Sequence, residues 1–391
     1  MTLDSNGFLK DVKVLTVEQA AALPYCTWRL AVEGANVVRI EPLWGDPNRK
    51  VGKKVIEEEG MNAYFMSVNA GKKGISLNLG TPQGQEILGE LIDKLEVDIF
   101  ACNQLPGNYK KLGIDYERIS SIKSDIIWVE ISGFGPDRSE PAYDPMIQAY
   151  SGIMDVNGEP NTPPLKFGVS IVDIEAGNQA YSEIMKALYL REKTGNGRRI
   201  DISMLDCAMS LLSLQVPLFS LGIDIPKTGN FHASFAPVGV YTTKDGYISI
   251  AIGNEAQWRS MIEFPDFEVL DKPEYSTNND RTAHADQLND DINSVLHKKH
   301  TSEILQMFKK AKIPISEVST IKDVLEDSYL SSKLLCTKDP KTDLEVTLAP
   351  PPVKPISKPD LSFPPRFGEH NKEIYTSLGY DEADLKKKGI I

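Results

Sequence analysis

Asp173 is the residue of this sequence best placed to carry out chemistry. It follows the mostly apolar run 167–172 and stands just before the small residues Ala176 and Gly177. Burying a carboxylate costs free energy, so a carboxylate in apolar surroundings normally has either a partner or a task. The tasks open to this one are attack on an electrophile as a nucleophile and removal of a proton as a base.

A helix is predicted to begin close to Asp173. Ala180, Ile184 and Leu188 recur at intervals of four residues, which indicates one buried helical face, and Gly195 is typical of a helix end. The helix dipole and the free N–H groups of the first turn favour the ionised form of Asp173, by about 0.3–1 kcal/mol at an exposed site. Asp is also a frequent N-cap residue, and on spacing alone that structural interpretation is the more common one.

Strand-like and helix-like segments alternate through the first half of the chain. The predicted strands are residues 12–15, 36–40, 75–79, 98–101 and 126–131, and the predicted helices are residues 17–34 and 81–95. This alternation predicts an α/β fold with a largely parallel sheet and helices on its faces. Ligands of such sheets bind outside the carboxyl ends of the strands, so the chemistry is expected there.

The later part of the chain has a different pattern. Residues 238–242 and 247–252 flank Gly246 and predict a hairpin, and the more polar segment 259–321 is predicted to be helical. Residues 340–365 are rich in Pro and Lys and predict an extended connector. We expect a large domain in residues 1–220, a small α+β domain in 221–335, and a connector with a C-terminal return to the large domain in 336–391.

Composition narrows the classes of function. The chain has 391 residues, of which 41% are hydrophobic and 25% charged, as is ordinary for a globular enzyme of about two domains. Its net charge of -12 argues against a nucleic-acid partner and against an anionic membrane surface. No stretch approaches the roughly 18 apolar residues of a membrane span, and residues 1–10 lack a signal-peptide core. We therefore expect a cytoplasmic protein.

No cofactor or metal motif stands out. The four cysteines are widely separated and form no CxxC or Cys/His spacing, so neither a metal site nor a disulfide framework is expected. Ser132-Gly-Phe-Gly135 is typical of a turn that approaches a ligand, but it lacks the GxGxxG spacing of dinucleotide sites. Walker A and GxSxG sequences are absent as well. The residues alone leave Asp173 between a helix cap and a catalytic carboxylate.

Short motifs spread along the chain resemble those of one known family. They are Leu23-Pro-Tyr-Cys-Thr27, Gly34-Ala-Asn-Val-Val-Arg-Ile-Glu41, Gly45-Asp-Pro-Asn-Arg49, Asn69-Ala-Gly-Lys-Lys-Gly-Ile-Ser-Leu-Asn-Leu79, Thr81-Pro-Gln-Gly84, Asn103 with Pro106-Gly107, Leu112-Gly113, Ser132-Gly-Phe-Gly135, Tyr143-Asp-Pro-Met-Ile-Gln-Ala149, Leu190-Arg-Glu-Lys-Thr-Gly195, Asp201-Ile-Ser-Met-Leu-Asp206, Gly229-Asn-Phe-His232, Ala236-Pro237, Asp245-Gly246 and Gly368-Glu-His370. In this order, over nearly its whole length, the chain resembles the class III CoA-transferases, the family of the formyl-CoA:oxalate and carnitine CoA-transferases.

The resemblance assigns a task to Asp173. In that family an Asp of the segment matching residues 170–177 is the nucleophile, and Asp173 holds that position. The resemblance implies that its carboxylate attacks an acyl-CoA thioester, that a mixed anhydride and then an aspartyl-CoA thioester form, and that an acceptor acid takes over the CoA. No cofactor is expected, because coenzyme A enters as part of the thioester substrate.

The resemblance also implies the contacts to CoA. The matching residues are Leu79, Asn103, Gln104, Leu105, Lys111 and Tyr143. Gln104 and Leu105 replace the usual Phe-Arg of the family, and Ala21 replaces a Gln that lies near the nucleophile of the oxalate enzymes. These departures argue against oxalate as the substrate, and they also fit a heteromer whose partner subunit shares the work.

Two alternatives stay open beside this interpretation. The superfamily includes α-methylacyl-CoA racemases, which place a His before an Asp where this chain has Tyr143-Asp144. Tyr143 removes that acid/base partner, since a two-base mechanism needs a suitable group on each face of the substrate. The other alternative is a non-catalytic, CoA-binding subunit of a heteromeric transferase, which Asp173 argues against and the altered Gln104 and Leu105 argue for.

Assembly and substrates follow from the resemblance as expectations. The family combines a Rossmann-like large domain with a smaller inserted domain, and two chains interlock, so we expect a homodimer or a heteromer with a related subunit. An apolar mouth around Ala20, Ala21, Leu23 and Tyr25 favours a bulky or aromatic acid over oxalate. We expect succinyl-CoA as the donor and an aromatic or alkyl-substituted acid, such as benzylsuccinate, as the acceptor.

Overall fold

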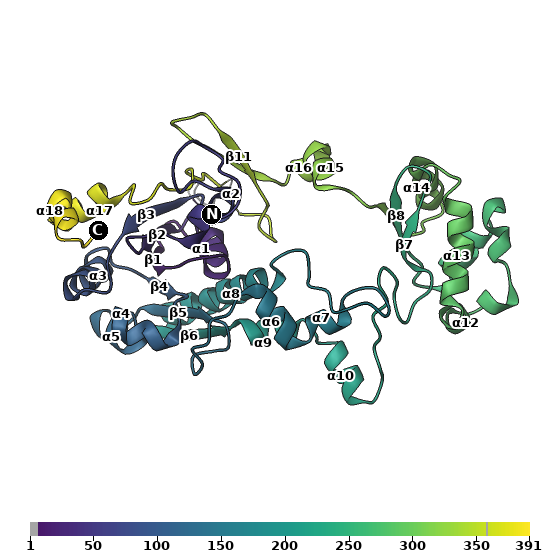
Figure 1. The fold of residues 1–391 in the computed structure, drawn as a ribbon, viewed down its shortest axis with the longest axis horizontal. Helices are drawn as coiled ribbons and strands as arrows, with labels where there is room; N and C mark the ends of the chain where they lie inside the picture. Colours follow the sequence, from purple (N-terminus) through teal and green to yellow (C-terminus); the bar gives the residue numbers. More distant parts are fainter. Residues whose placement is uncertain (1–6, 357–358) are drawn as a thin grey trace. The chain divides into compact units, whose positions relative to one another are not determined.

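The computed structural model describes residues 7–356 and 359–391, which form two compact units. Unit 1 comprises Met1–Ile153, Phe167–Leu212 and Lys333–Ile391, and unit 2 comprises Met154–Lys166 and Ser213–Ser332. The chain crosses between the units at each of these boundaries, as the colours of Figure 1 allow the reader to follow. Each unit therefore gathers segments that are separated in the sequence.

The core of unit 1 is a six-stranded sheet with the order β3-β2-β1-β4-β5-β6, and all its neighbouring strands pair in parallel. The strands are β1 Lys13–Val17, β2 Asn36–Glu41, β3 Lys72–Ser76, β4 Ile99–Cys102, β5 Ile127–Ser132 and β6 Arg198–Ser203. Every residue of β4 and β5 is buried, as expected for central strands that are covered on both faces. The prediction of an α/β fold with a parallel sheet is confirmed.

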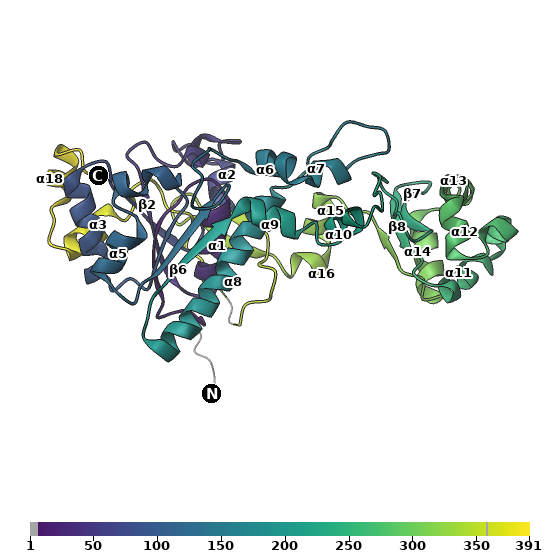
Figure 2. The same cartoon turned by 90° about the horizontal axis from the view of Figure 1, so that it is seen from below.

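Helices cover the faces of this sheet. Helices α3 Pro82–Lys94, α5 Tyr116–Ile122, α17 Asn371–Ser377 and α18 Glu382–Lys387 contribute to one apolar core around Phe100 and Trp128. Helices α1 Ala22–Val32 and α8 Ile171–Thr194 pack against each other, and α8 also contacts β5 and β6 (Figure 2). Helix α8 is thus anchored on the sheet beside its two last strands.

Shorter elements complete unit 1. They are the 3-10 helices η1 Pro47–Lys50 and η2 Pro106–Asn108, the helices α2 Ala63–Met66, α4 Tyr109–Leu112, α6 Asp144–Ser151 and α9 Met204–Ser210, and the hairpin of β10 Leu335–Lys338 with β11 Glu345–Leu348. Residues 340–365, predicted as an extended connector, therefore contain a strand, and the prediction was wrong there. Buried Asp339 stabilises the hairpin turn by accepting the hydroxyl of Thr342 at 2.6 Å.

Two predicted elements of unit 1 were misplaced. The helix predicted at 17–34 begins only at Ala22, because Val17 completes β1 and residues 18–21 form a loop. The strand predicted at 75–79 is β3, three residues earlier, because Leu77 and Leu79 turn into the apolar core instead of extending the sheet. The helix after Thr81 begins as predicted, with the Thr81 hydroxyl accepting the N–H of Gly84 at 3.1 Å.

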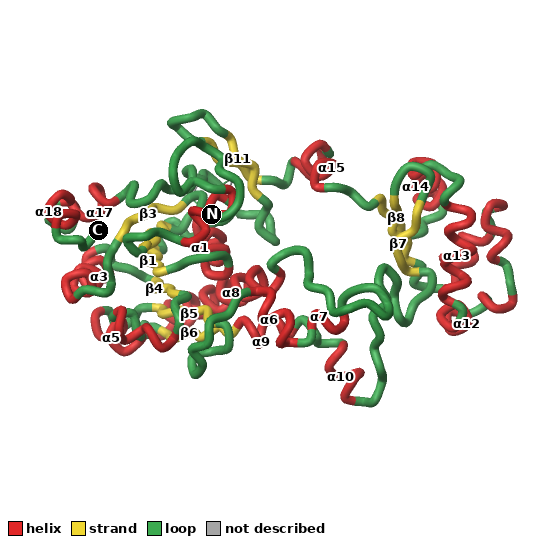
Figure 3. The backbone as a smooth tube through the Cα atoms, viewed as in Figure 1, coloured by secondary structure: helices red, strands yellow, loops and turns green. Residues whose placement is uncertain are grey.

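Unit 2 is built on a three-stranded antiparallel sheet in the order β7-β8-β9, with β7 Val238–Thr242, β8 Tyr247–Ala251 and β9 Ile315–Glu317. Figure 3 labels β7 and β8 side by side. The predicted hairpin around Gly246 is confirmed. Its helical elements are α10 Gln215–Ser220, α11 Glu255–Ile262, η3 Pro265–Leu270, η4 Pro273–Tyr275, α12 Asn278–Ala283, α13 Ala285–Leu296, α14 Thr301–Lys310, α15 Ile321–Glu326 and α16 Ser328–Ser331, while α7 Ile153–Val156 lies at the boundary of the units. Trp258, Ile292 and Phe308 belong to its separate apolar core. Across the described residues of both units, no helix combines the length and the apolar character that a membrane crossing requires.

Candidate active site

A pocket of about 200 Å³ opens at the carboxyl ends of the central strands of unit 1. The strand order of the sheet reverses between β1 and β4, and parallel sheets bind ligands at such a switch point. Residues that follow β1, β4 and β5 form its wall together with the start of α8. The lining residues are Gln19, Ala20, Ala22, Asn103, Gln104, Leu105, Pro106, Ile131, Ser132, Gly133, Glu140, Pro141, Ala142, Tyr143, Asp173 and Met204.

Asp173 lies in this pocket, in the first turn of α8. Ser170 holds the N-cap position and makes no side-chain cap, so the interpretation of Asp173 as the N-cap was wrong. The cap comes instead from Asp144 at the start of α6, whose Oδ2 accepts the backbone N–H groups of Val172 at 2.8 Å and of Asp173 at 3.2 Å. A neighbouring helix thereby satisfies N–H groups that the first turn of α8 leaves free.

The capping carboxylate is itself held in place. Gln148, one turn further along α6, donates an Nε2–H to Oδ1 of Asp144 at 2.5 Å and accepts the N–H of Phe167 through Oε1 at 2.8 Å. Asp144 and Gln148 are both buried. Because Asp144 caps the helix, the Asp173 side chain is not used for capping, and it has no hydrogen-bond or ion-pair partner among the residues that the structure describes.

Burial raises the pKa of Asp173 to about 7, and the nearby Asp144 carboxylate adds to the rise. The ordinary pKa of this side chain is 3.8. The expectation that a helix start would favour the ionised carboxylate was therefore wrong for this site, because desolvation outweighs the helix dipole. Near pH 7 the protonated and ionised forms of Asp173 are both well populated, as is common for groups at functional sites.

Helix α1 lies directly against the first turns of α8. A Cβ at Gly177 would be 2.8 Å from the carbonyl oxygen of Ala22 and 2.8 Å from Cδ1 of Tyr25, so the close approach depends on glycine. Gly177 follows Asp173 by four residues, which places both on one face of α8. The N-terminal end of α1, including Ala22, thus forms part of the wall of the Asp173 pocket.

The turn between β1 and α1 forms another part of this wall. Gln19 and Ala20 line the pocket, and Ala20 has a φ of 61°, in the left-handed region that favours glycine. Asn103, which follows β4, holds the turn, because its Oδ1 accepts the N–H of Gln19 at 3.0 Å and its Nδ2 donates to the Gln19 carbonyl at 2.8 Å. Nothing in residues 17–22 signals this turn, since their composition is that of a helix.

The family model of CoA-transferase family III matches residues 9–371. The chain belongs to this family. It is an enzyme that transfers CoA, and the resemblance seen in the sequence is confirmed.

This CoA-transferase is similar to several named relatives. It is 31% identical to the succinyl-CoA:glutarate CoA-transferase of Homo sapiens, over 98% of this chain and 90% of the relative. It is 29% identical to the succinyl-CoA:mesaconate CoA-transferase of Haloarcula marismortui, over 96% of this chain and 97% of the relative. Among solved structures, a CAIB/BAIF family protein from Brucella suis is similar with a TM-score of 0.84 and 30% identity, over 95% of this chain and 100% of that chain.

The structure of the CoA-transferase brings five of the seven predicted site residues together. Asn103, Gln104, Leu105 and Tyr143 line the pocket that contains Asp173. Tyr143 is at the N-cap position of α6 and is 67% exposed, so its ring stands at the open side of the pocket. Their contacts to CoA stay predictions.

The other two predicted CoA contacts lie elsewhere in unit 1. Leu79 is buried in the apolar core around Phe100. Lys111 is exposed on α4, and its carbonyl accepts an Nε2–H of Gln85 at 2.9 Å. Neither residue belongs to the wall of the Asp173 pocket, and a contact of either to CoA stays a prediction.

The apolar mouth that the sequence suggested is only partly formed by its four residues. Ala20 lines the pocket, whereas Leu23 and Tyr25 are buried. Gln19, Asn103 and Gln104, whose side chains end in polar amide groups, line the same pocket. The wall therefore combines polar and apolar residues, and the preference for an aromatic acid stays a prediction.

A larger open hollow of about 590 Å³ lies in unit 2. Its carboxylates are either paired or exposed, since Glu255 binds Arg281 at 2.9 Å and Asp271 is exposed. Lys272 of the same hollow binds Asp291 at 2.5 Å. Neither carboxylate of this hollow is both half-buried and unpartnered, as Asp173 is. The candidate active site is therefore the pocket of unit 1.

Proposed function

We propose that this enzyme moves CoA from an acyl-CoA to a free carboxylic acid through a covalent intermediate on Asp173. One observation carries the proposal. The Asp173 carboxylate is half-buried in the pocket and has no partner among the described residues. Glu140, the other carboxylate of the wall, is exposed and paired with Arg138 at 2.7 Å. Asp173 is thus the carboxylate that is available to attack a substrate.

The first half of the reaction loads CoA onto the enzyme. An oxygen of the ionised Asp173 attacks the thioester carbonyl carbon of the donor, the C–S bond breaks, and the CoA thiolate leaves behind a mixed anhydride. The thiolate then attacks the aspartyl carbonyl carbon. This step releases the donor acid as a carboxylate and leaves an aspartyl-CoA thioester.

The second half passes the CoA to the acceptor. A carboxylate oxygen of the acceptor attacks the aspartyl carbonyl carbon and frees the thiolate, so that Asp173 carries an anhydride with the acceptor. Attack of the thiolate on the acceptor carbonyl carbon gives the new acyl-CoA and regenerates the Asp173 carboxylate. Water takes no part in these steps, and the pocket must keep it from hydrolysing the anhydrides.

The start of α1 supplies N–H groups suited to the oxyanions of these steps. Ala21 precedes α1 without a side-chain cap, and in the described part of the chain the N–H groups of Ala22 and Leu23 find no acceptor. Ala22 lines the pocket together with Asp173. Free N–H groups at a helix start stabilise negative charge, which supports a role of this turn in oxyanion binding.

The geometry favours CoA transfer over the two alternatives. Racemisation needs a general acid or base on each side of the substrate carbon. Tyr143 stands where the racemases have their His, and Asp144 is engaged by the N–H groups of α8. A non-catalytic subunit is disfavoured because the nucleophile position is filled by an unpartnered Asp173 in a formed pocket.

We propose succinyl-CoA as the donor and a dicarboxylic acid or a substituted succinate as the acceptor. Relatives named after succinyl-CoA support the donor, and the acceptors in their names, glutarate, mesaconate and D-citramalate, are all dicarboxylates. Benzylsuccinate belongs to the same chemical class and adds the aromatic ring that the sequence suggested. The residues proposed to contact CoA are Leu79, Asn103, Gln104, Leu105, Lys111 and Tyr143.

An acceptor panel tests the proposed function. Purified enzyme is given succinyl-CoA with glutarate, mesaconate, citramalate, benzylsuccinate, an aromatic monocarboxylate or oxalate, and new CoA thioesters are identified by mass spectrometry. We expect a new thioester with one or more of the dicarboxylates, none with oxalate, and none from Asp173→Ala. Hydrolysis of succinyl-CoA without any new thioester, or equal activity of Asp173→Ala, would contradict the proposal.

We further propose that the enzyme is an interlocked homodimer or a heteromer with a related subunit. Large apolar side chains are exposed in both units, including Tyr189 on α8 and Phe219 on α10, which are 65% and 69% exposed. Exposed apolar surface of this kind is typical of a protein interface. Sedimentation should show a dimer or a larger assembly, and a folded, active monomer would contradict the proposal.

A further inference from the structure

The turn formed by Gln19 and Ala20 is a strained part of the active-site wall. Ala20 has a φ of 61°. A residue with a Cβ populates this region about tenfold less than glycine does, because the Cβ approaches the following carbonyl oxygen. The turn lines the pocket of Asp173, so contacts from the rest of the chain must keep Ala20 in this conformation.

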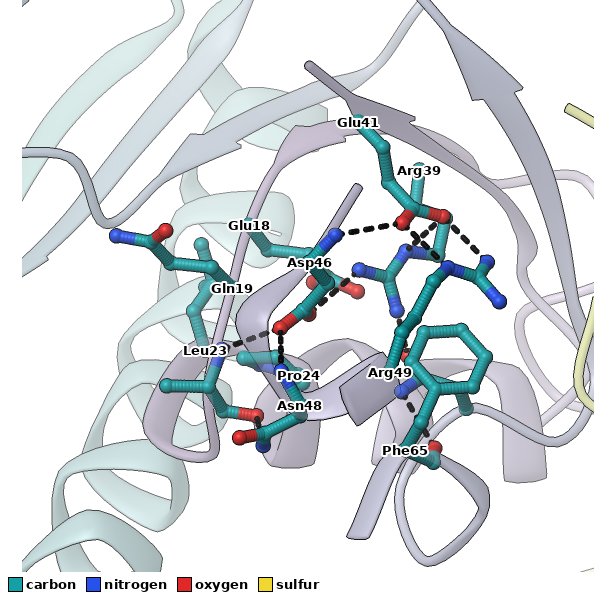
Figure 4. A network of polar contacts seen from close by, with 12 residues as sticks. Glu18, Gln19, Leu23, Pro24, Arg39, Glu41, Asp46, Asn48, Arg49 and Phe65 are labelled. Carbon is teal, nitrogen blue, oxygen red and sulfur yellow. Dashed lines mark hydrogen bonds and ion pairs between the residues drawn. The ribbon is translucent and has the colours of Figure 1, made fainter. Parts of the chain in front are cut away.

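Two side chains from the loop after β2 hold Ala20. Asn48 donates an Nδ2–H to the carbonyl oxygen of Ala20 at 2.9 Å. Oδ1 of Asp46 accepts the N–H of Ala20 at 3.4 Å and the N–H of Asn48 at 2.8 Å. The peptide groups on both sides of the strained residue are therefore bound to one short loop, and Figure 4 draws its Asp46 and Asn48 side chains.

This loop is anchored in a buried ionic network. Asp46 is 2% exposed and pairs through Oδ2 with Nη2 of Arg39 at 2.8 Å. Glu41 accepts the N–H of Asp46 at 3.0 Å and binds Nη2 of Arg49 at 2.6 Å. Removing one partner of a buried ion pair is strongly destabilising, because the other charge is left unpaired. The network therefore fixes the loop that carries Asn48 (Figure 4).

The same network also reaches the residue that precedes the turn. Arg39 and Lys72 both donate to Oδ1 of Asn69, at 2.5 and 3.1 Å. Lys72 then binds the fully buried side chain of Glu18 at 2.7 Å. The ion pair of Glu18 therefore holds the residue before the turn, and Asp46 and Asn48 hold Ala20 within it.

We propose that Asn48 is a positioning residue of the transfer reaction and acts through Ala20. Asn48 is half-buried and is not a member of the pocket wall, so its hydrogen bond to Ala20 is its link to the site. Without that bond Ala20 leaves the left-handed region more readily, and the wall of the Asp173 pocket loses its fixed position. The inference rests on the proposed function of Asp173.

Asn48→Ala tests this inference, with Asn62→Ala as the matched control. Asn62 also donates an Nδ2–H to a loop carbonyl, that of Gly52 at 3.1 Å, but neither of these residues lines the pocket. Transfer is measured from succinyl-CoA to an acceptor that the wild type uses. We expect kcat of Asn48→Ala to fall about tenfold while KM for succinyl-CoA stays within about twofold, and we expect the kcat of Asn62→Ala to equal the wild-type value.

Ala20→Gly separates positioning from a general loss of structure. Glycine adopts the left-handed conformation without a Cβ penalty, so the turn needs less support. In the Ala20→Gly background, Asn48→Ala should therefore lower kcat by less than about threefold. A tenfold loss in both backgrounds would overturn the inference, because Asn48 would then not act through the conformation of Ala20.

Hydrogen exchange supplies a readout that needs no activity. Amides in the peptide covering residues 18–25 should exchange about tenfold faster in Asn48→Ala than in the wild type or the control, while the rest of unit 1 keeps its wild-type exchange. Unchanged exchange in this peptide would overturn the inference, as would faster exchange with a wild-type kcat. A wild type that transfers CoA to no acceptor would instead overturn the proposed function and leave the exchange result to decide the role of Asn48 in the turn.

Discussion

The carboxylate of Asp144 accepts the backbone N–H of Asp173 at 3.2 Å and thereby caps helix α8, in whose first turn Asp173 lies. This relationship has two consequences for Asp173. Its own side chain is not used for capping, and a second carboxylate lies close enough to raise its pKa. The contact therefore links the fold of α8 to the reactivity of the proposed nucleophile.

The rate of transfer should depend on the ionisation of Asp173. Only the ionised carboxylate attacks, so kcat/KM should fall about tenfold per pH unit below a midpoint near 7. Asp144→Asn removes the neighbouring charge and should move this midpoint to lower pH. The midpoint should stay well above the ordinary value of 3.8, because burial is the larger cause of the raised pKa. The measurement is a pH profile of kcat/KM for both enzymes.

Glu183→Gln is the control for the loss of a negative charge. Glu183 lies on α8 as well, but it pairs with Lys186 on the same helix instead of contacting the pocket. Its profile should match that of the wild type. A midpoint that stays in place or rises in Asp144→Asn would show that Asp144 does not act on the pKa of Asp173.

Stability should depend on pH through the same carboxylate. The native state binds a proton at Asp173 up to about pH 7, whereas the unfolded chain loses it near pH 4, so Asp173 lowers stability as pH rises through this window. Asp173→Asn removes this cost. Its free energy of unfolding should exceed that of the wild type by about 1–3 kcal/mol at pH 8, and the difference should vanish near pH 4.

Urea unfolding at both pH values and at matched protein concentration measures this difference. An Asp173→Asn enzyme that is less stable than the wild type at pH 8 would show that the ionised carboxylate has a stabilising partner. A stability difference that is the same at both pH values would show that ionisation is not its source.

Helix α8 illustrates what the sequence can predict. Its apolar period and the glycine that ends it are local signals, and the helix ends at Gly195 as predicted, with a φ of 70° there. The cap could not be predicted, because Asp144 and Asp173 are 29 positions apart and no local pattern pairs them. The raised pKa of Asp173 was missed because it arises mainly from burial, which depends on how distant segments pack around the side chain.

The turn before α1 shows where local reasoning failed. Residues 17–22 have the propensity of a helix, and no glycine marks the positive φ of Ala20. The contacts that hold the turn come from distant residues, since Asn103 binds Gln19 and Asn48 binds Ala20. Such tertiary contacts can override local helix propensity, which amounts to less than about 1 kcal/mol per residue.

The packing of α1 on α8 predicts the effect of a single added methyl group. Gly177→Ala places a Cβ 2.8 Å from the carbonyl oxygen of Ala22, so the two helices must separate. We expect it to lower the free energy of unfolding by about 1–3 kcal/mol and to reduce kcat, because the wall of the pocket moves. Urea unfolding and transfer assays measure the two effects.

Gly89→Ala is the matched control, since Gly89 is also a helical glycine. A Cβ there lies 3.5 Å from Cδ1 of Ile122, which is an ordinary contact. Alanine favours a helix over glycine by about 1 kcal/mol, so this variant should be as stable as the wild type or more stable. A Gly177→Ala enzyme that behaves like Gly89→Ala would contradict the tight packing of α1 on α8.

The cysteines should differ sharply in their reactivity. Cys26, Cys102 and Cys207 are buried, and burial raises the pKa of Cys26 to about 12 and that of Cys207 to about 11. Cys336 is exposed. A thiol reagent at pH 8 should therefore label Cys336 first, and the other three only after unfolding, because the thiolate is the reactive form. Rapid labelling of Cys26 in the folded enzyme would contradict its burial in α1.

Detection of the covalent intermediate is the most direct test of Asp173 as the nucleophile. The enzyme is incubated with succinyl-CoA in the absence of an acceptor, treated with hydroxylamine or borohydride, digested, and examined by mass spectrometry. We expect a modification at Asp173, none in Asp173→Ala, and its loss when an accepted carboxylic acid is added before trapping. An unmodified Asp173, together with CoA transfer that persists in Asp173→Ala, would contradict the covalent mechanism.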